Sequence, residues 1–167
     1  MAPSRDDRFH DLVRQLSPAI GSYLGRRLYP LTRADLDDLV EETLTILWRR
    51  LDDVPTDAAL PWALGVARNV LRNAHRAHHR RHHYEGQLRT RGTDASAEDY
   101  VLADEGVRDA LARLSDDDRE ILLLHAWDGL NADALGRTLL ISSNAAAVRL
   151  SRAQAKFKEH FHDVVVP

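Results

Sequence analysis

The chain has 167 residues, and 23 Lys and Arg against 26 Asp and Glu give a formal charge of −3. Hydrophobic residues make up 44% and charged residues 29%, which is typical of a globular chain and not of a disordered or fibrous one. The absence of cysteine excludes a disulfide framework, a thiolate zinc finger and a cysteine nucleophile. No apolar run approaches the roughly 18 to 20 residues of a membrane span, and no signal-peptide core follows the amino terminus. We therefore expect a cytoplasmic protein without membrane insertion.

Opposite charges are segregated along the chain. Residues 35–53 hold seven acids and two arginines, whereas residues 61–83 hold five arginines, five histidines and no acid. Acids dominate again over residues 94–120, and residues 137–158 carry five basic groups and no acid. Of the 23 basic residues 21 are arginine, which favours planar recognition of phosphates and bases. The alternation indicates two kinds of partner surface.

The N-terminal half is predicted to form three helices, because its apolar residues recur at a spacing near 3.6. The first helix carries a stripe from Phe9 to Leu24 and contains Pro18, which favours a kink or a break. Thr32 and Asp35 form a capping-box pattern, with Asp in place of Glu, at the start of the second helix. Pro61 suits the first turn of the third helix.

The C-terminal half is predicted to be helical as well. Residues 84–97 contain two glycines and no apolar stripe, so we expect a flexible linker there. A fourth helix is expected from about Glu98, and Ser115 is expected to cap a fifth. A short helix over 132–139 and a long helix over 144–161 follow, separated by a tight turn. The predicted fold is all-α, with two small helical domains joined by a flexible linker and a C-terminal helix-turn-helix.

The last helix has a basic face that suits nucleic acid. Arg149, Arg152 and Lys156 lie at i, i+3 and i+7, so they share a face that could meet phosphates and base edges in a major groove. A solvated amphipathic helix is the alternative interpretation, but the preceding short helix and turn favour DNA binding. The residues expected on its buried side are Ala145, Val148, Leu150, Ala153 and Phe157.

Three segments resemble one protein family, in the order in which that family carries them. DDDREILLLHAWDGLNADALGRTLLISSNAAAVRLSRAQ resembles the promoter-binding fourth domain of sigma-70 family factors of the extracytoplasmic-function (ECF) group. LPWALGVARNVLRNAHRAHHRR is similar to the part of their second domain that melts and reads the minus-10 element. LDDLVEETLTILWRRL resembles the region that docks on the clamp helices of RNA polymerase. The resemblance implies a transcription initiation factor, with domain two over residues 1–83, a linker over 84–97 and domain four over 98–167.

The resemblance also implies three sets of site residues. The polymerase-binding residues would be Asp37, Asp38, Leu39, Glu41, Glu42 and Leu47. The minus-10 residues would be Trp62, Arg68, Asn69, Arg72, Asn73, Arg76 and Arg80. The minus-35 residues would be Asn144, Arg149, Ser151, Arg152 and Lys156.

Each of these sets has a plainer interpretation. The acids could simply solvate one helix face, and the arginines of the third helix could make non-specific phosphate contacts. Trp62 could stack on an unpaired base or could be an ordinary core residue. The family often carries arginine where this chain has Ala147 and Gln154, so minus-35 recognition would rest principally on Arg149 and Arg152.

Five of the nine histidines lie at positions 75, 78, 79, 82 and 83. The pairs at i and i+4 have a spacing that can chelate zinc, but the nearest acid is Glu85 and the intervening arginines repel a cation. We therefore expect no metal site and no cofactor. A nucleic-acid surface that gains charge on mild acidification is the favoured interpretation.

The expected partners are core RNA polymerase and promoter DNA, and an anti-sigma protein that occludes the polymerase-binding surfaces is a further candidate. The alternative function is a stand-alone helix-turn-helix regulator, which needs neither the acidic helix nor the Trp-containing basic helix. An enzyme is not expected, because the sequence lacks a carboxylate–histidine arrangement, a phosphate loop and a nucleophile motif.

Overall fold

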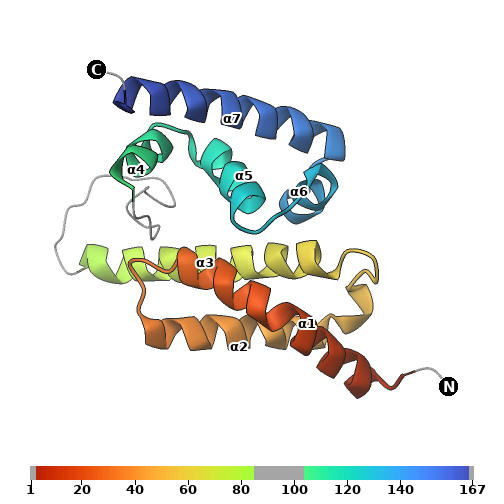
Figure 1. Ribbon diagram of the computed structural model, residues 1–167. Coiled ribbons are helices and arrows are strands. Elements are labelled where there is room, and N and C mark those ends of the chain that lie inside the picture. The colour runs from red at the N-terminus through yellow and green to blue at the C-terminus, as the bar shows by residue number, and fades with distance from the viewer. Residues whose placement is uncertain (1–2, 85–103, 166–167) are drawn as a thin grey trace.

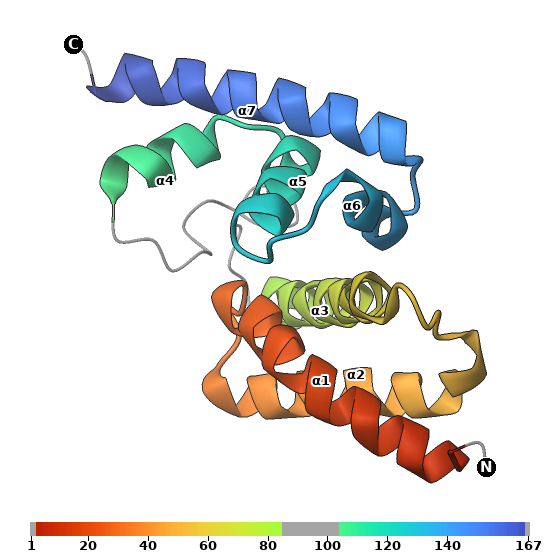
Figure 2. The same cartoon turned by 45° about the vertical axis from the view of Figure 1, so that its right-hand side comes forward.

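The computed structural model describes residues 3–84 and 104–165. These residues form seven α-helices and one short 3-10 helix, Leu51–Asp53, and no β-strand. The N-terminal bundle consists of α1 (Arg5–Arg26), α2 (Arg33–Arg49) and α3 (Ala59–Tyr84). The C-terminal bundle consists of α4 (Glu105–Ala112), α5 (Asp116–Ala126), α6 (Ala132–Leu139) and α7 (Ser143–Val165). The two bundles lie one above the other, with α3 along the side where they meet (Figures 1 and 2), and the predicted all-α class is confirmed.

The helices begin where the sequence places capping side chains. At the start of α2, the Asp35 carboxylate accepts hydrogen bonds from the Thr32 backbone N–H (2.7 Å) and hydroxyl (2.8 Å). The Ser115 hydroxyl accepts from the backbone N–H of the third residue of α5 (3.2 Å), and the Asn131 side chain does the same in α6 (2.9 Å). These bonds satisfy N–H groups that have no partner inside the helix.

Three features of the predicted helices can be compared with the structure. α1 continues through Pro18 without a break, and its packed residues on both sides of the proline hold it in place. α3 begins at Ala59, and Pro61 lies in its first turn, as predicted. α4 begins at Glu105, after the capping residue Asp104, and the expected start near Glu98 lies outside the described part of the chain.

One hydrophobic core runs through both bundles, because α3 contacts α1 and α2 on one side and α6 on another. Such burial removes apolar surface from water and is the main favourable contribution to folding. A smaller second cluster joins α4, α5 and α7 around Leu111, Leu114 and Leu123. The principal members of the main core are Leu16, Ile20, Leu24, Leu39, Leu47, Leu64, Ala67, Leu71, Ile121, Leu124, Leu135, Ala146 and Ala153.

The buried Arg119 ties α4 to α5. Its guanidinium donates to the carbonyl oxygens of Leu111 (2.9 Å) and Leu114 (3.0 Å), at the C-terminal end of α4 and the loop that follows. The Leu111 carbonyl also accepts from the Leu114 backbone N–H (3.2 Å), and the positive guanidinium suits the negative end of the helix dipole. The sequence alone gives no signal for this contact.

The turn between α6 and α7 is tight and contains a strained residue. A Cβ atom on Gly136 would lie 2.8 Å from the carbonyl oxygen of Ile141, so only glycine fits there. Leu140 has a φ of 58°, in the left-handed region that favours glycine. Its side chain is 89% exposed, so no burial offsets the strain.

We expect Leu140→Gly to raise the free energy of unfolding by up to about 1 kcal/mol. The left-handed conformation costs roughly 1–2 kcal/mol for an L-residue with a Cβ, and the greater flexibility of unfolded glycine cancels part of this gain. Urea denaturation measures the effect. The control is Leu139→Gly, at a helical position that packs against the core, which should lower stability. A loss of stability in both variants would contradict the account of the turn.

Candidate functional site

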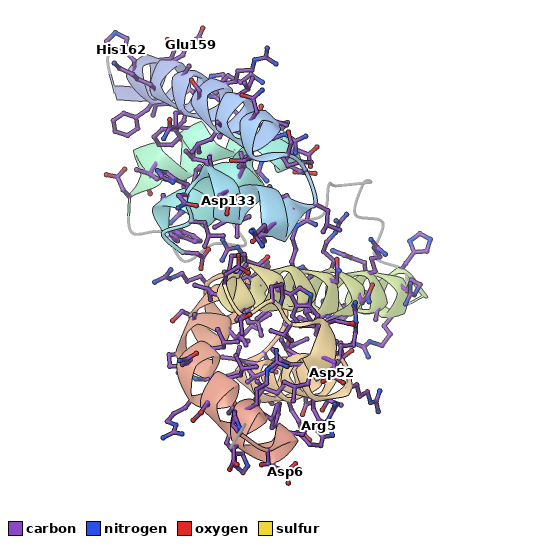
Figure 3. All side chains as sticks on the ribbon, turned by 90° about the vertical axis from the view of Figure 1, so that its right-hand side faces the viewer. Arg5, Asp6, Asp52, Asp133, Glu159 and His162 are labelled. Atoms are coloured by element: carbon purple, nitrogen blue, oxygen red, sulfur yellow. The ribbon has the colours of Figure 1, made fainter. Side chains whose placement is uncertain are left out.

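An apolar groove with acidic residues at its edges lies between α1 and α2, and we call it the α1–α2 groove. Trp48 is 37% exposed there, and its ring contacts the Phe9 ring edge-on at a centroid distance of 5.0 Å. The guanidinium of Arg5 lies 5.0 Å from the Trp48 ring centroid, and it also forms a 2.8 Å ion pair with Asp52 (Figure 3). The groove is lined by Asp6, Phe9, His10, Val13, Asp37, Val40, Glu41, Leu44, Thr45 and Trp48.

The structure divides the six expected polymerase-binding residues into two groups. The acids Asp37, Asp38, Glu41 and Glu42 are all exposed on α2. Leu39 and Leu47 are only 5% and 0% exposed. This corrects the expectation that these two leucines supply apolar contacts to a partner, because they form the buried face of α2. The apolar residues that α2 presents in the groove are Val40, Leu44 and Trp48.

The expected minus-10 residues lie along α3 and differ in exposure. Asn69, Asn73, Arg76 and Arg80 are exposed, whereas Trp62, Arg68 and Arg72 are half-buried. Trp62 packs against the main core, and the Arg50 guanidinium lies 5.4 Å from its ring centroid. The indole therefore already contributes to packing, and only part of its surface is open to a nucleic-acid base.

A buried ion pair joins the two bundles. Arg27 Nη2 at the end of α1 lies 2.8 Å from Asp128 Oδ2, and the two side chains are only 4% and 5% exposed. Arg27 also donates to the Tyr23 carbonyl oxygen (3.1 Å), and its guanidinium stacks 4.0 Å from the Tyr23 ring centroid. Burial raises the pKa of Asp128 above its ordinary value, because the loss of hydration outweighs the attraction of Arg27.

Glu120 of α5 extends this contact toward α3. The Tyr23 hydroxyl donates to Glu120 Oε1 (3.1 Å), and Arg68 Nε lies 3.6 Å from the same oxygen. Burial raises the pKa of Tyr23 well above its ordinary value, with Glu120 acting in the same direction, so the phenol stays a hydrogen-bond donor. On the other side of the ion pair, Arg26 donates to the Trp127 carbonyl oxygen (2.9 Å).

The α6 helix approaches α3 closely. The Thr138 hydroxyl donates to the Pro61 carbonyl oxygen (3.1 Å), and a Cβ on Gly65 would lie 3.3 Å from the Thr138 carbonyl oxygen. Arg137 forms a partly exposed ion pair with Asp57 (3.3 Å). We call the contacts of α1 and α3 with α5, α6 and the loop after α5 the interbundle seam.

The seam brings acids of α5 against bases of α3. A cavity of about 70 Å³ lies between them. Its lining includes Arg68 and Arg72 from α3 and Asp116, Asp117 and Glu120 from α5. An expected DNA-contacting region of the N-terminal bundle is therefore partly covered by the acidic start of α5.

The exposed face of α7 is set by the residues that it buries. Ala146 and Ala153 are 0% exposed and pack in the core, so the opposite face, with Asn144, Ser151 and Arg152, is open to solvent. The expectation that Ala145 and Val148 are buried is wrong: both are exposed. Three consecutive alanines at 145–147 gave no indication of which one faces the core.

Arg149 and Lys156 lie on the side of α7 next to α5. Lys156 Nζ donates to Asp118 Oδ2 (2.6 Å), and Arg149 is half-buried nearby. Burial opposes ionisation of Asp118, but the hydrogen bonds from Lys156 and Ser115 and the charge of Arg149 hold its pKa below the usual range. Of the five expected minus-35 residues, the structure therefore brings Asn144, Ser151 and Arg152 together on the open face and places the other two beside an acid.

The histidines near the end of α3 pack against each other. The rings of His78 and His82 stack with centroids 4.0 Å apart, and His82 Nδ1 lies 3.0 Å from the His78 carbonyl oxygen. Over residues 3–84 and 104–165, no group of three or more His, Asp or Glu side chains is arranged to hold a metal ion. In the same residues, none of the helices combines the length and the apolar character that crossing a membrane requires.

We expect Asp128→Asn to lower the free energy of unfolding by about 3 kcal/mol or more. Removing one partner of a buried ion pair leaves an unpaired buried charge on Arg27, which is costly. Urea denaturation measures the loss, and Asp11→Asn is the matched control because its ion pair with Arg14 is exposed. Similar effects of the two substitutions would contradict the role assigned to the buried pair.

We expect His78→Gln to weaken the acid sensitivity of the fold. Burial, His82 and His79 lower the pKa of His78 below 6.5, so the unfolded chain binds the proton more readily. Protonation of His78 therefore favours the unfolded chain, and the fold loses stability as the pH falls through about 6.5. The decrease in Tm between about pH 7.5 and about pH 5.5 should be smaller in the variant. His162→Gln, at the far end of α7 (Figure 3), is the control, and an unchanged decrease in His78→Gln would contradict the prediction.

Two family models match the chain. Sigma-70 region 2 matches residues 12–81, which lie in α1 to α3, and Sigma-70, region 4 matches residues 104–157, which run from the start of α4 into α7. The order of these two regions is the order that the sequence resemblance implied.

The chain is also similar, in sequence or in fold, to individual proteins. RNA polymerase sigma factor CarQ of Myxococcus xanthus is 30% identical over 158 residues, which cover 92% of this chain and 88% of CarQ. The fold is similar to that of sigma factor RpoE in its complex with the anti-sigma factor NepR from Bartonella quintana (TM-score 0.63, 21% identity, 91% and 95% of the two chains). It is also similar to CnrH in complex with the cytosolic domain of CnrY (TM-score 0.58, 23% identity, 90% and 85%). The chain therefore belongs to the sigma-70 family of RNA polymerase sigma factors, in its ECF group.

Proposed function

We propose that this sigma factor docks on core RNA polymerase through α2 and the α1–α2 groove, and that α3 and α7 read the promoter. The observation that carries the proposal is that one chain combines an apolar groove edged by acids with two helices that expose arginine and asparagine. Residues 1–83 would act as sigma domain two, residues 84–97 as the linker and residues 98–167 as sigma domain four.

The docking surface combines charge with apolar area. Four exposed acids on α2 would attract a basic surface of the polymerase, and such pairs between exposed charges weaken with salt. Each exposed pair contributes little by itself. Leu44 and Trp48 in the groove would supply the apolar contact area that makes the complex stable.

The exposed residues of α3 are the candidates for the minus-10 element. Asn69 and Asn73 can reach the polar edges of unpaired bases, and Arg76 and Arg80 suit phosphates. Arg68 faces Glu120 in the seam, so it becomes available to DNA only when α5 moves away from α3.

The open face of α7 is the candidate for the minus-35 element. Arg152 can contact guanine O6 and N7 in a bidentate manner, which discriminates by roughly 1–3 kcal/mol. Asn144 and Ser151 share its face, while Arg149 and Lys156 at the side of the helix suit phosphates.

The remaining elements of the proposal follow from the family. The protein would act without catalytic activity of its own, in the cytoplasm, where it meets RNA polymerase. An anti-sigma protein is a proposed partner, because the similar RpoE structure is a complex with an anti-sigma factor. Such a partner would compete with the polymerase for the α1–α2 groove.

Run-off transcription on genomic promoters, with core polymerase in the presence and absence of the chain, tests the proposal. Transcripts should appear only with the chain. The double variant Asp38→Lys, Glu42→Lys should give fewer transcripts and weaker retention of core polymerase in a pull-down, and the defect should grow with salt, because it replaces attraction by repulsion.

The matched control is Glu159→Lys, which reverses an exposed acid on α7 at the opposite end of the molecule from the groove residue Asp6 (Figure 3). It should retain polymerase normally. Binding of duplex promoter DNA without any retention of core polymerase would instead indicate a stand-alone helix-turn-helix regulator.

A further inference from the structure

We propose that Val148 reads the 5-methyl group of a thymine in the minus-35 element. The inference rests on the proposed role of α7 in the major groove and adds an apolar specificity residue to it. The side chains so far considered on α7 recognise DNA through hydrogen bonds and charge. None of them detects a methyl group.

The position of Val148 on α7 follows from the buried residues. Ala146 and Ala153 are 0% exposed and mark the inward face of the helix. At 100° per residue, Val148 lies roughly opposite that face, one turn after Asn144 and one turn before Arg152. It therefore occupies the middle of the face that would enter the groove.

The exposure of Val148 has no structural explanation within the described residues. Its side chain is 43% exposed, and it is one of four large hydrophobic residues there that are exposed to this degree. Trp48 lies in the α1–α2 groove, Tyr29 lies in the turn after α1, and Leu140 lies in the turn that precedes α7. Val148 is therefore the one of these four that stands on a helix face outside the groove.

The chemistry of the major groove provides one partner for such a residue. The edges of the base pairs there present hydrogen-bond donors and acceptors, and the thymine 5-methyl is the apolar group among them. Valine cannot form a hydrogen bond, and its branched side chain is stiff, so little rotamer entropy is lost on contact. Ala155 lies on the same face two turns further on and is small enough to let the helix approach the bases.

The spacing predicts where this thymine lies. Four helical residues rise about 6 Å, and successive base pairs are about 3.4 Å apart. The thymine should therefore lie within about two base pairs of the guanine that Arg152 contacts.

Replacement of thymine by deoxyuridine, which removes only the methyl group, tests the proposal. Holoenzyme formed with this chain is first used to select its preferred minus-35 sequence from a duplex library. Each thymine of that element, on either strand, is then replaced in turn by deoxyuridine, and binding is titrated. Burial of one methyl group corresponds to about a three- to fourfold effect, so one substitution should weaken wild-type binding by about that factor.

The variants separate this contact from the others. Val148→Ala should bind the thymine and deoxyuridine duplexes within about 1.5-fold of each other, because its methyl no longer reaches the base. It should fold normally, because the side chain is exposed and alanine favours helices. Val148→Thr retains one methyl and the branched shape, so it should keep most of the discrimination. Arg152→Ala should lose a guanine preference and keep the response to deoxyuridine.

Two results would overturn the proposal. One is a wild-type holoenzyme that is insensitive to deoxyuridine at every position, and the other is a Val148→Ala holoenzyme with the same sensitivity as wild type. If Arg152→Ala still shows the guanine preference in either case, the proposed role of α7 fails together with the inference. If only the response to deoxyuridine is missing, the inference fails and the role of α7 stands.

Discussion

The buried ion pair between Arg27 and Asp128 is the interaction on which the relation of the two bundles depends. The two residues are 101 positions apart, and both are almost completely removed from water. Taking two charges out of water is costly, so such a pair persists only when additional hydrogen bonds and good packing surround it. Here the Tyr23 carbonyl and ring support the guanidinium, and the Tyr23 hydroxyl holds the neighbouring Glu120. The same few side chains therefore fix where α5 lies against α1 and α3.

The helix α3 has two structural roles at the meeting of the bundles. Toward α1 and α2 it supplies core residues such as Leu64 and Leu71, and toward α6 it allows a close approach at Gly65. Its remaining surface carries the arginines and asparagines proposed to contact DNA. A single helix thus contributes both to the core that the two bundles share and to a candidate nucleic-acid interface.

Much of the helical architecture could be predicted from the sequence, because caps and apolar spacing act locally. Thr32 with Asp35, and Ser115, mark the starts of α2 and α5, and the bounds of α6 were predicted correctly. Assignments of helix faces were less accurate. On α2 the apolar residues outnumber the buried positions, so spacing alone did not distinguish Leu47 in the core from Trp48 in the groove.

The tertiary contacts were not predictable from spacing. Nothing near Arg27 in the sequence indicates that its partner is Asp128, and nothing near Lys156 indicates Asp118. The spacing of Arg149, Arg152 and Lys156 predicts that they share one face of α7. In the structure, α5 lies beside the part of that face that carries Arg149 and Lys156. Which of them are open to a ligand depends on where another helix packs, and the pattern within α7 does not contain that information.

The Glu120 carboxylate contacts both the Tyr23 hydroxyl and Arg68, and this has a consequence for any ligand that approaches Arg68. The carboxylate belongs to the same chain, so its effective concentration beside Arg68 does not change when the protein is diluted. A phosphate in solution must therefore compete with an anion that is always present at the same local concentration. Raising the protein concentration cannot shift that competition in either direction, whereas disruption of the contacts that hold α5 in place shifts it at once. The availability of Arg68 is thus a property of the folded chain itself, independent of how much of the protein a cell contains.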